Sequence, residues 1–479
     1  MSSRASALST RPYSRRARTS LAPSAAAPFF DVLNWNQAIY WFLLLPMMFF
    51  AAVGKFSVLD LSDNSKLASE YGSLQTTDSG PPIHKYLAFL VYIVVIFALI
   101  AFRKRLFQAC AQNALMLALP ILAIASTAWS QFPKVTVLYS GYIVLTTLFS
   151  IYIATRFTPE RQIGLWLFNG TVALAASIAI VIVFPQAGVD AKGFLGAWQG
   201  IYPHKNIAAL MTVLFLIPVF SFEAKTKWHR TFRLLYTIFS LFFIVMTTAR
   251  TGWLQTGIVL MSLVGLKFLR KFSSRDRPIV IFALVPLIVT VVVGATILAP
   301  YLAVLMGKDP TLTGRTEIWK ACIASAMKRP WLGYGFFAFW NGLQGEAANT
   351  AMAAADISLG NAENGVLQMW LEIGLVGVAI LAVMLIRTCR NAAKVIFRKD
   401  APAYVDWYFG VVVFTLLSLV DGAKFLMPHA LYWMMYVVAD VGLAAEVRRT
   451  KAIDAVDHQA ALAESAARQR SRRRLRVAS

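Results

Sequence analysis

Long apolar runs recur along almost the whole chain and constrain its fold more than any other feature. Most are about 17 to 22 residues long, and as an α-helix such a run crosses the roughly 30 Å hydrocarbon layer of a bilayer. Backbone polar groups must find partners inside lipid, so these runs are expected to be helical. The sequence predicts an all-α polytopic membrane protein with about twelve transmembrane helices. They are expected at 36–53, 86–102, 111–127, 135–154, 163–184, 206–222, 234–248, 252–266, 278–299, 365–386, 405–420 and 425–443.

Positive charge is divided unevenly between alternate connecting segments. The chain carries 46 Lys and Arg against 23 Asp and Glu, a formal net charge of +23. With the amino terminus placed in the cytoplasm, 33 of the 46 basic residues fall on cytoplasmic segments, as the positive-inside rule requires. The basic excess therefore reflects membrane topology and not a nucleic-acid partner. Both termini are predicted to be cytoplasmic.

This topology divides the chain into five segments. Residues 1–35 are expected to form a basic cytoplasmic arm, 36–299 the first nine helices, 300–364 a large periplasmic loop, 365–443 the last three helices, and 444–479 a basic cytoplasmic tail. The first span lacks a cleavage signature after it and is expected to stay as an anchor. The tail is expected to lie against anionic lipid or to be disordered. Three scattered cysteines suit neither a disulfide framework nor a metal site.

The loop 300–364 is too long for a simple connection and is expected to be functional. An amphipathic helix is predicted over 313–328, ended by Pro330. Arg315 and Trp319 lie four residues apart and so share one side of this helix. A plain solvated face with an aromatic residue at the membrane interface would show the same pattern.

Directly after this helix, residues 329–336 read Arg-Pro-Trp-Leu-Gly-Tyr-Gly-Phe. Two glycines beside Tyr334 predict a turn that lets backbone approach a neighbour closely. The alternative interpretation is a structural re-entry into the membrane, flanked by interface aromatics.

Two further polar elements are predicted on the same side of the membrane. His204, Lys205 and Asn206 stand together at the start of the sixth span, where unsatisfied polar groups would be costly. A capped helix with a snorkelling lysine is the simpler interpretation. Arg250 occupies a tight turn between the seventh and eighth spans, and an arginine at that depth usually pairs with an anion. A phosphate would serve as well as a carboxylate.

Two carboxylates mark the start of the tenth span. Glu363 precedes Asn364 at its outer edge, where desolvation or an arginine would shift the pKa of the carboxyl group. Either shift suits a proton-accepting group. Glu372 lies nine residues deeper and is expected to face the helix bundle as a structural residue.

The order of these motifs resembles one membrane-enzyme family. The motifs are Trp129-Ser130, His204-Lys205-Asn206, Arg250, Gly314-Arg315-x-x-x-Trp319, Pro330-x-x-Gly333-Tyr334-Gly335, Asn364-x-x-Leu367-Gln368 and Glu372-x-Gly374-Leu375-x-Gly377. In this order and on one side of the membrane, they are similar to the O-antigen ligase and O-antigen or exopolysaccharide polymerase family. The nearest resemblance is to exopolysaccharide-production polymerases of the ExoQ type. It covers about 129–385 and neither basic tail.

The resemblance implies metal-independent glycan transfer at the periplasmic face of the bacterial inner membrane, with no cofactor. The donor would be an oligosaccharide on undecaprenyl diphosphate, and a chain-length regulator and a flippase would be possible partners. A leaving diphosphate needs cations, and the attacking hydroxyl needs a base. Arg250, Arg315 and Lys205 fit the first need, since guanidinium forks hold phosphate oxygens well. By the same resemblance, residues expected to position substrate are Asn206, Trp319, Tyr334 and Asn364.

The chain departs from the family pattern at the expected base. Family members commonly have His-Asn before the tenth span, and here the pair is Glu363-Asn364. Either Glu363 takes the proton, or His204 does, or the chain is a divergent or inactive member.

The motifs leave a polymerase and a ligase both open, with basic tails favouring the polymerase. A lipid-linked oligosaccharide transporter is a further alternative, although its midplane would be expected to carry more ionisable groups.

Overall fold

The protein is almost entirely helical in the computed structural model, which describes residues 46–49, 82–190, 196–272, 315–340, 345–353, 360–398, 401–420, 425–428 and 430–478. The helices are α4 (Pro82–Ala101), α5 (Arg103–Gln112), α6 (Ala118–Ala125), α7 (Pro133–Arg156), α8 (Pro159–Val183), α9 (Pro185–Gly188), α10 (Lys205–Ser221), α11 (Lys227–Met246), α12 (Arg250–Leu269), α14 (Arg315–Lys328), α15 (Glu346–Ala353), α16 (Gly365–Ile396), α17 (Tyr404–Val420) and α18 (Leu431–Ala478). Short 3₁₀ turns are η3 (Ala114–Leu117) and η4 (Ser126–Ala128), and β1 (Val189–Asp190) pairs antiparallel with β2 (Ala197–Trp198).

Several helices have the length and composition of membrane spans. Among the described residues, five qualify, namely α7, α8, α11, α12 and α16, and the bent pair α4 and α5 would make a sixth. The apolar helices α10 and α17 are shorter, at 17 residues each. The fold is that of a helical membrane protein. The predicted total of twelve spans stays a prediction, because the ninth (278–299) and most of the first (36–53) lie outside the described residues.

The predicted third span, 111–127, starts later than expected, because the apolar helix runs from Ala114 to Ala128. Residues 103–112 form α5, which is bent by 87° from α4, and Asn113 ends α5. Its side-chain amide donates to the Ala109 carbonyl at 2.9 Å, so the polar side chain caps the last turn. The apolar segment then continues as η3, α6 and η4.

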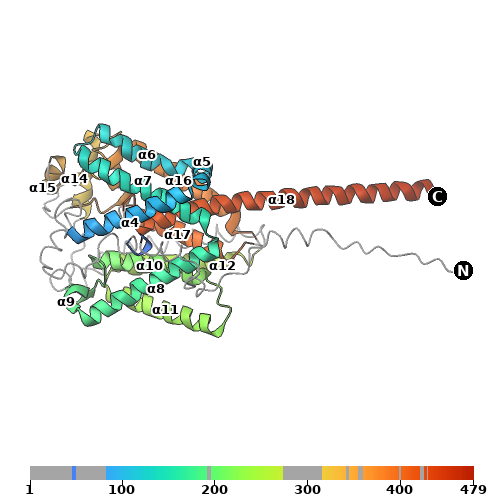
Figure 1. The fold of residues 1–479 in the computed structure, drawn as a ribbon, viewed down its shortest axis with the longest axis horizontal. Helices are drawn as coiled ribbons and strands as arrows, with labels where there is room; N and C mark the ends of the chain where they lie inside the picture. The colour runs from blue at the N-terminus through green and yellow to red at the C-terminus, as the bar shows by residue number, and fades with distance from the viewer. Residues whose placement is uncertain are drawn as a thin grey trace.

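Successive long helices run in opposite directions, so their connections gather at two ends of the bundle (Figure 1). Helices α9, α14 and α15 lie at one end, which we call the loop end, and α18 leaves from the opposite tail end (Figure 1). The N-termini of α7, α10, α12 and α16 all point to the loop end. Helix N-termini carry free N–H groups and a partial positive charge.

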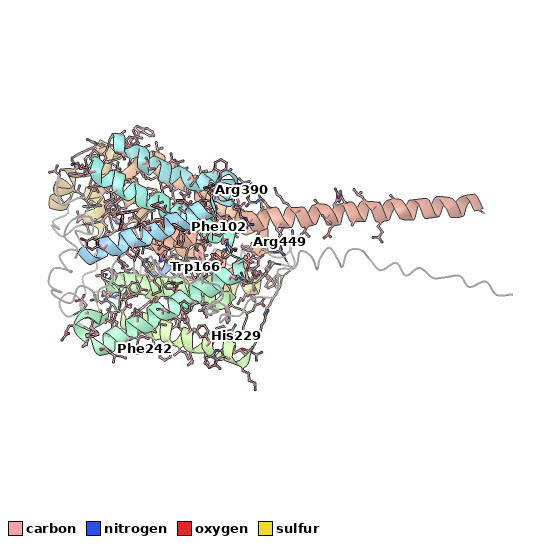
Figure 2. The ribbon with its side chains drawn as sticks, viewed as in Figure 1. Phe102, Trp166, His229, Phe242, Arg390 and Arg449 are labelled. Carbon is pink, nitrogen blue, oxygen red and sulfur yellow. The ribbon has the colours of Figure 1, made fainter. Side chains whose placement is uncertain are left out.

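Two groups of helices share the core. Helix α18 packs on α7, α16 and α17, while α10 packs on α8, α11, α12 and α17. Small residues allow close approach: Gly442 lies against the Tyr408 ring and Gly410 against Ile217, as expected where packing drives helix association in lipid. Trp166 is fully buried in the bundle, whereas Phe242 on α11 is half exposed (Figure 2).

Ion pairs hold helices together toward the tail end. Arg270, directly after α12, contacts Asp406 of α17 at 2.6 Å, and Arg387 of α16 contacts the fully buried Asp440 of α18 at 3.4 Å. Figure 2 shows Arg449 close to the point where α18 leaves the bundle. Breaking a buried pair by removing one partner is costly, about 3–5 kcal/mol. These pairs therefore fix neighbouring helices in one register.

The C-terminal tail is helical, which is contrary to the disordered alternative, and its contact with anionic lipid stays a prediction. The predicted last span and the tail form the single helix α18, which extends away from the bundle (Figure 1). No Gly or Pro interrupts the sequence between 443 and 478, and Ala and Arg favour helix. The Arg398 guanidinium donates two hydrogen bonds to the Asp454 carboxylate of α18, both with N–O distances of 2.9 Å.

Candidate functional site

At the loop end, helix α16 is interrupted where the glycine-containing turn 329–335 meets it. Gly374 has φ +72° and ψ −175° inside the helix, so the carbonyls before it and the N–H groups after it lose their helical partners. The turn supplies new ones: Tyr334 and Gly335 N–H donate to the carbonyls of Leu371 and Glu372, both at 2.9 Å. In the other direction, Leu375 N–H donates to the Pro330 carbonyl at 2.8 Å. A broken membrane helix is tolerated when neighbouring groups satisfy it in this way.

Glycine is required in this turn for two reasons. Gly333 and Gly335 have φ of +66° and +105°, a region that favours glycine. A Cβ on Gly333 would come within 2.6 Å of the Leu371 carbonyl oxygen, and one on Gly335 would overlap Ser130. The predicted close backbone approach is therefore present, and the neighbour approached is α16.

The same turn is joined to the N-terminal end of α7. The Trp129 indole donates to the Leu332 carbonyl at 2.9 Å, and Gln131 N–H donates to the Tyr334 carbonyl at 3.1 Å. Segments about 200 residues apart in sequence thus form one unit at the loop end. Trp129, the first residue of the motif order, is therefore part of this unit.

Tyr334 and Trp319 belong to a small apolar core between α14, the turn and α16. The Tyr334 hydroxyl donates to the Ser325 carbonyl at 2.8 Å, and burial, with the charge of Glu346, raises its pKa to about 12. The Trp319 indole N–H is buried and meets no acceptor among the described residues. Both side chains therefore hold α14 in place. Helix α14 was predicted from 313–328 and is present, while α15 was not predicted.

Arg315 is the first residue of α14. Its side chain lies outside the described residues, so its predicted contact with a diphosphate stays a prediction. The α14 helix packs on α16, which places this N-terminus at the loop end.

Glu363 and Asn364 occupy the entry to α16. Glu363 has φ +47°, a left-handed conformation that is uncommon for residues other than glycine. Its N–H donates to the Asn361 side chain at 2.6 Å. Asn364 is the N-cap: its side-chain oxygen accepts from the N–H groups of Val366 and Leu367, both at 3.0 Å. The Asn364 side chain thus stabilises the helix.

Below this entry lies a buried polar chain beside a narrow pocket. Gln368 donates to the Glu372 carboxylate at 2.5 Å and accepts from the Trp340 indole at 3.0 Å. Glu372 is 5% exposed, as expected for a residue facing the bundle. The pocket has room for about one water molecule and is lined by Phe337, Gly365, Gln368, Met369, Glu372, Ile373, Phe425 and Leu426.

A second polar group, the cationic group, lies at the starts of α10 and α12. It consists of Asp190, His204, Lys205, Thr248 and Arg250. The Lys205 ammonium donates to the Thr248 hydroxyl at 3.3 Å, and the charges of Asp190 and Arg250 both act on Lys205. Thr248 has φ +52°, which is strained for a β-branched residue. Arg250 is exposed, so its guanidinium is accessible.

His204 is a neutral N-cap in this group. Its Nδ1 accepts from the Asn206 N–H at 3.2 Å, so the proton of the neutral ring is on Nε2. Burial and the charge of Lys205 lower the pKa of His204 to about 4, while Asp190 acts in the opposite direction. The imidazole is uncharged at neutral pH. The Asn206 side chain itself is exposed.

The structure thus brings His204, Lys205 and Arg250 together. Trp319, Tyr334, Glu363 and Asn364 gather around the entry to α16, at the same end of the bundle. Sequence reasoning did not identify Asp190 or Thr248, because Asp190 follows a span with no motif and Thr248 has no distinctive spacing. No cluster of three or more His, Cys, Asp or Glu that could hold a metal occurs in the described part of the chain.

These features define a membrane-embedded helical protein with a polar site at one end. The segment 235–382 matches the family model described as O-antigen ligase, and this segment contains Arg250, Arg315 and Glu363 but not His204. This match supports the resemblance to the O-antigen ligase and polymerase family that the motif order predicted. Family members are glycosyltransferase-like enzymes that act on lipid-linked oligosaccharides in the membrane. No curated protein matches the chain.

Proposed function

We propose that the chain is a polysaccharide polymerase of the bacterial inner membrane, with its active face in the periplasm. It transfers a glycan from a polyprenyl diphosphate to a sugar hydroxyl of an acceptor repeat unit, in exopolysaccharide or O-antigen synthesis. The observation that carries this proposal is the cationic group at the same end of the bundle as Glu363. A diphosphate leaving group and a hydroxyl nucleophile need these two kinds of residue.

The cations act on the leaving group. Lys205 and Arg250 lie at two helix N-termini, whose free N–H groups and partial positive charge favour a bound anion. As the bond between the anomeric carbon and the diphosphate oxygen breaks, its electron pair stays on the diphosphate, and these charges stabilise it. Arg315, at the start of α14, adds a third cation. No metal ion is needed in this scheme.

Glu363 serves as the base. The acceptor oxygen forms a new bond to the anomeric carbon, with inversion, while its proton passes to the Glu363 carboxylate. His204 is unsuited to that role, because the Asn206 N–H occupies Nδ1 and a pKa of about 4 makes it a weak base at neutral pH. Its Nε2–H instead donates to a phosphate oxygen.

The test is complementation of a strain that lacks the chain with R250A, R315A or E363Q, checking the amount of each variant in the membrane. We expect each to lose high-molecular-weight polymer while single repeat units persist. The matched control is K320A, which removes an exposed α14 cation paired with Glu317 at 2.9 Å and leaves polymer unchanged. Normal polymer from all three site variants would contradict the proposal.

A ligase is the second candidate, favoured by the description of the matching family model. It would move finished glycan to lipid A core or to a protein by the same chemistry. The two are distinguished by product: a strain without a ligase accumulates long lipid-linked polymer, whereas a strain without a polymerase accumulates single repeat units.

A further inference from the structure

Two hydrogen bonds hold the backbone that leads into Glu363, which has a strained conformation. Its own N–H donates to Asn361 at 2.6 Å, and the N–H of the preceding Ala362 donates to the Gln368 side-chain oxygen at 3.0 Å. A left-handed conformation at a residue with a side chain costs roughly 1–2 kcal/mol and persists only where neighbouring contacts determine it. Gln368 therefore helps to fix the backbone from which the Glu363 side chain is presented.

The orientation of the Gln368 amide is determined by its partners. Its oxygen accepts two donors that cannot act as acceptors, the Trp340 indole and the Ala362 N–H, both at 3.0 Å. The amide nitrogen must then face Glu372, whose carboxylate it reaches at 2.5 Å. Reversing the amide would set N–H groups against N–H groups. Gln368 and Trp340 are 4% and 1% exposed, so water cannot replace the lost bonds at low cost.

Glu372 is itself held rigidly. Its backbone carbonyl accepts from Gly335 N–H at 2.9 Å, and the helix is interrupted two residues later at Gly374. The chain of contacts thus runs from the break in α16, through Glu372 and Gln368, to the peptide that precedes Glu363.

We propose that Gln368 and Glu372 are positioning residues that hold Glu363 in its reactive geometry. This inference rests on the proposed role of Glu363 as the base. Neither residue touches substrate. Glu372 acts as a hydrogen-bond acceptor that orients Gln368, and Gln368 in turn fixes the Ala362 peptide.

Exchanging the amide of Gln368 and the carboxylate of Glu372 tests this proposal. Q368E keeps an oxygen for Trp340 and Ala362 but sets a second carboxylate against Glu372, so the loop is displaced. We expect kcat for polymerisation by the purified protein in nanodiscs to fall about 10- to 100-fold, as expected for misplacement of a reacting group, with KM for the lipid-linked donor unchanged. In Q368E/E372Q, the introduced amide donates to the introduced carboxylate, and kcat should return to within about threefold of wild type.

E372Q alone is the conservative control. Its amide oxygen can still accept from Gln368, so we expect near-normal kcat and an unchanged pH profile. Loss of activity in E372Q, with no rescue in the double variant, would overturn the proposal and make the Glu372 charge itself essential. Thermal unfolding of each variant shows whether it is folded.

A second measurement separates this proposal from the proposed function. E363C, in a chain whose three native cysteines are replaced by alanine, reports the position of the loop by its rate of reaction with a membrane-impermeant maleimide. We expect Q368E to change this rate and Q368E/E372Q to restore it. If the labelling rate changes in Q368E and is restored in Q368E/E372Q, but polymerisation is the same in all Gln368 and Glu372 variants, Glu363 is not the base and the positioning role of Gln368 and Glu372 stands. An unchanged labelling rate in Q368E would refute that positioning role.

Discussion

At the residue scale, the site is made from side chains whose role depends on a neighbour. His204 resembles a catalytic histidine in sequence, yet the Asn206 N–H occupies one ring nitrogen, and burial with the charge of Lys205 lowers its pKa to about 4. Asn364 resembles a ligand-binding amide, yet its oxygen caps α16. Thr248 and Glu363 both have a strained left-handed backbone conformation. Thr248 belongs to the cationic group and Glu363 to the entry of α16, and such strain is common at functional sites.

The lowered pKa of His204 predicts that this residue does not shape the pH profile of activity near neutrality. H204N keeps a capping acceptor for the Asn206 N–H but cannot titrate. Because His204 stays neutral above about pH 4, wild type and H204N should show kcat/KM profiles of the same shape between pH 5.5 and 8. A step near pH 6.5 present only in wild type would contradict this.

The lowered pKa of His204 also predicts how the stability of the folded protein depends on pH. An unfolded histidine takes up its proton near pH 6.5, whereas folded His204 does not until about pH 4. The unfolded state binds more protons between these values, so stability falls as pH is lowered through this window. We expect the Tm of wild type in detergent to fall more steeply from pH 6.5 to 4 than that of H204N.

At the element scale, the central feature is the exchange of hydrogen bonds between the broken helix α16 and the turn 329–335. Each of the two segments would leave backbone groups unsatisfied without the other. Glycines stand where the two backbones come closest, at 333, 335 and 374. The turn and the break therefore form a single structural unit.

G374A tests this unit. Gly374 lies in a region of backbone conformation that is nearly exclusive to glycine, and its Cβ would overlap the Trp331 carbonyl. We expect a loss of at least about 1–3 kcal/mol in unfolding free energy, measured as a lower Tm in detergent. The control is G257A on α12, where an added Cβ meets nothing within 4 Å and alanine favours helix by about 1 kcal/mol. Equal Tm values for the two variants would contradict the account.

At the scale of the whole molecule, the candidate site lies at one end and the buried ion pairs between helices lie toward the other. The cationic group, the turn 329–335 and the entry to α16 lie at the loop end, whereas Arg270–Asp406 and Arg387–Asp440 fasten helices toward the tail end. A one-sided site suits group transfer at a membrane surface better than transport, which requires a path reaching both sides.

Sidedness can be measured with cysteines introduced at each end. N349C on α15 and D457C on α18 are both at exposed positions. With the loop end in the periplasm, an impermeant maleimide should label N349C in cells whose outer membrane is permeable, and D457C only after the inner membrane is opened. The reverse pattern would overturn the predicted topology and the proposed active face.

The sequence by itself determined the class of fold and indicated the family. Apolar runs long enough to cross a bilayer have few alternatives to helix in lipid, and loop charge indicates their direction. The order of short motifs indicated the family, and the end of the helix predicted over 313–328 followed from Pro330. These features depend on local composition and spacing, so they can be seen without knowledge of contacts.

Only the tertiary structure decided which residues meet and what state they adopt. Gln368, Glu372 and Trp340 form one hydrogen-bonded chain, Lys205 reaches Thr248, and the glycines at 333, 335 and 374 serve a single backbone contact. The pKa of His204 depends on its burial in the folded protein and on Asp190 as well as on the adjacent Lys205. The orientation of the Gln368 amide depends on Trp340, 28 residues away in sequence. Hydrogen bonding and desolvation act through space, over a few ångströms, and the spacing of residues along the chain does not contain them.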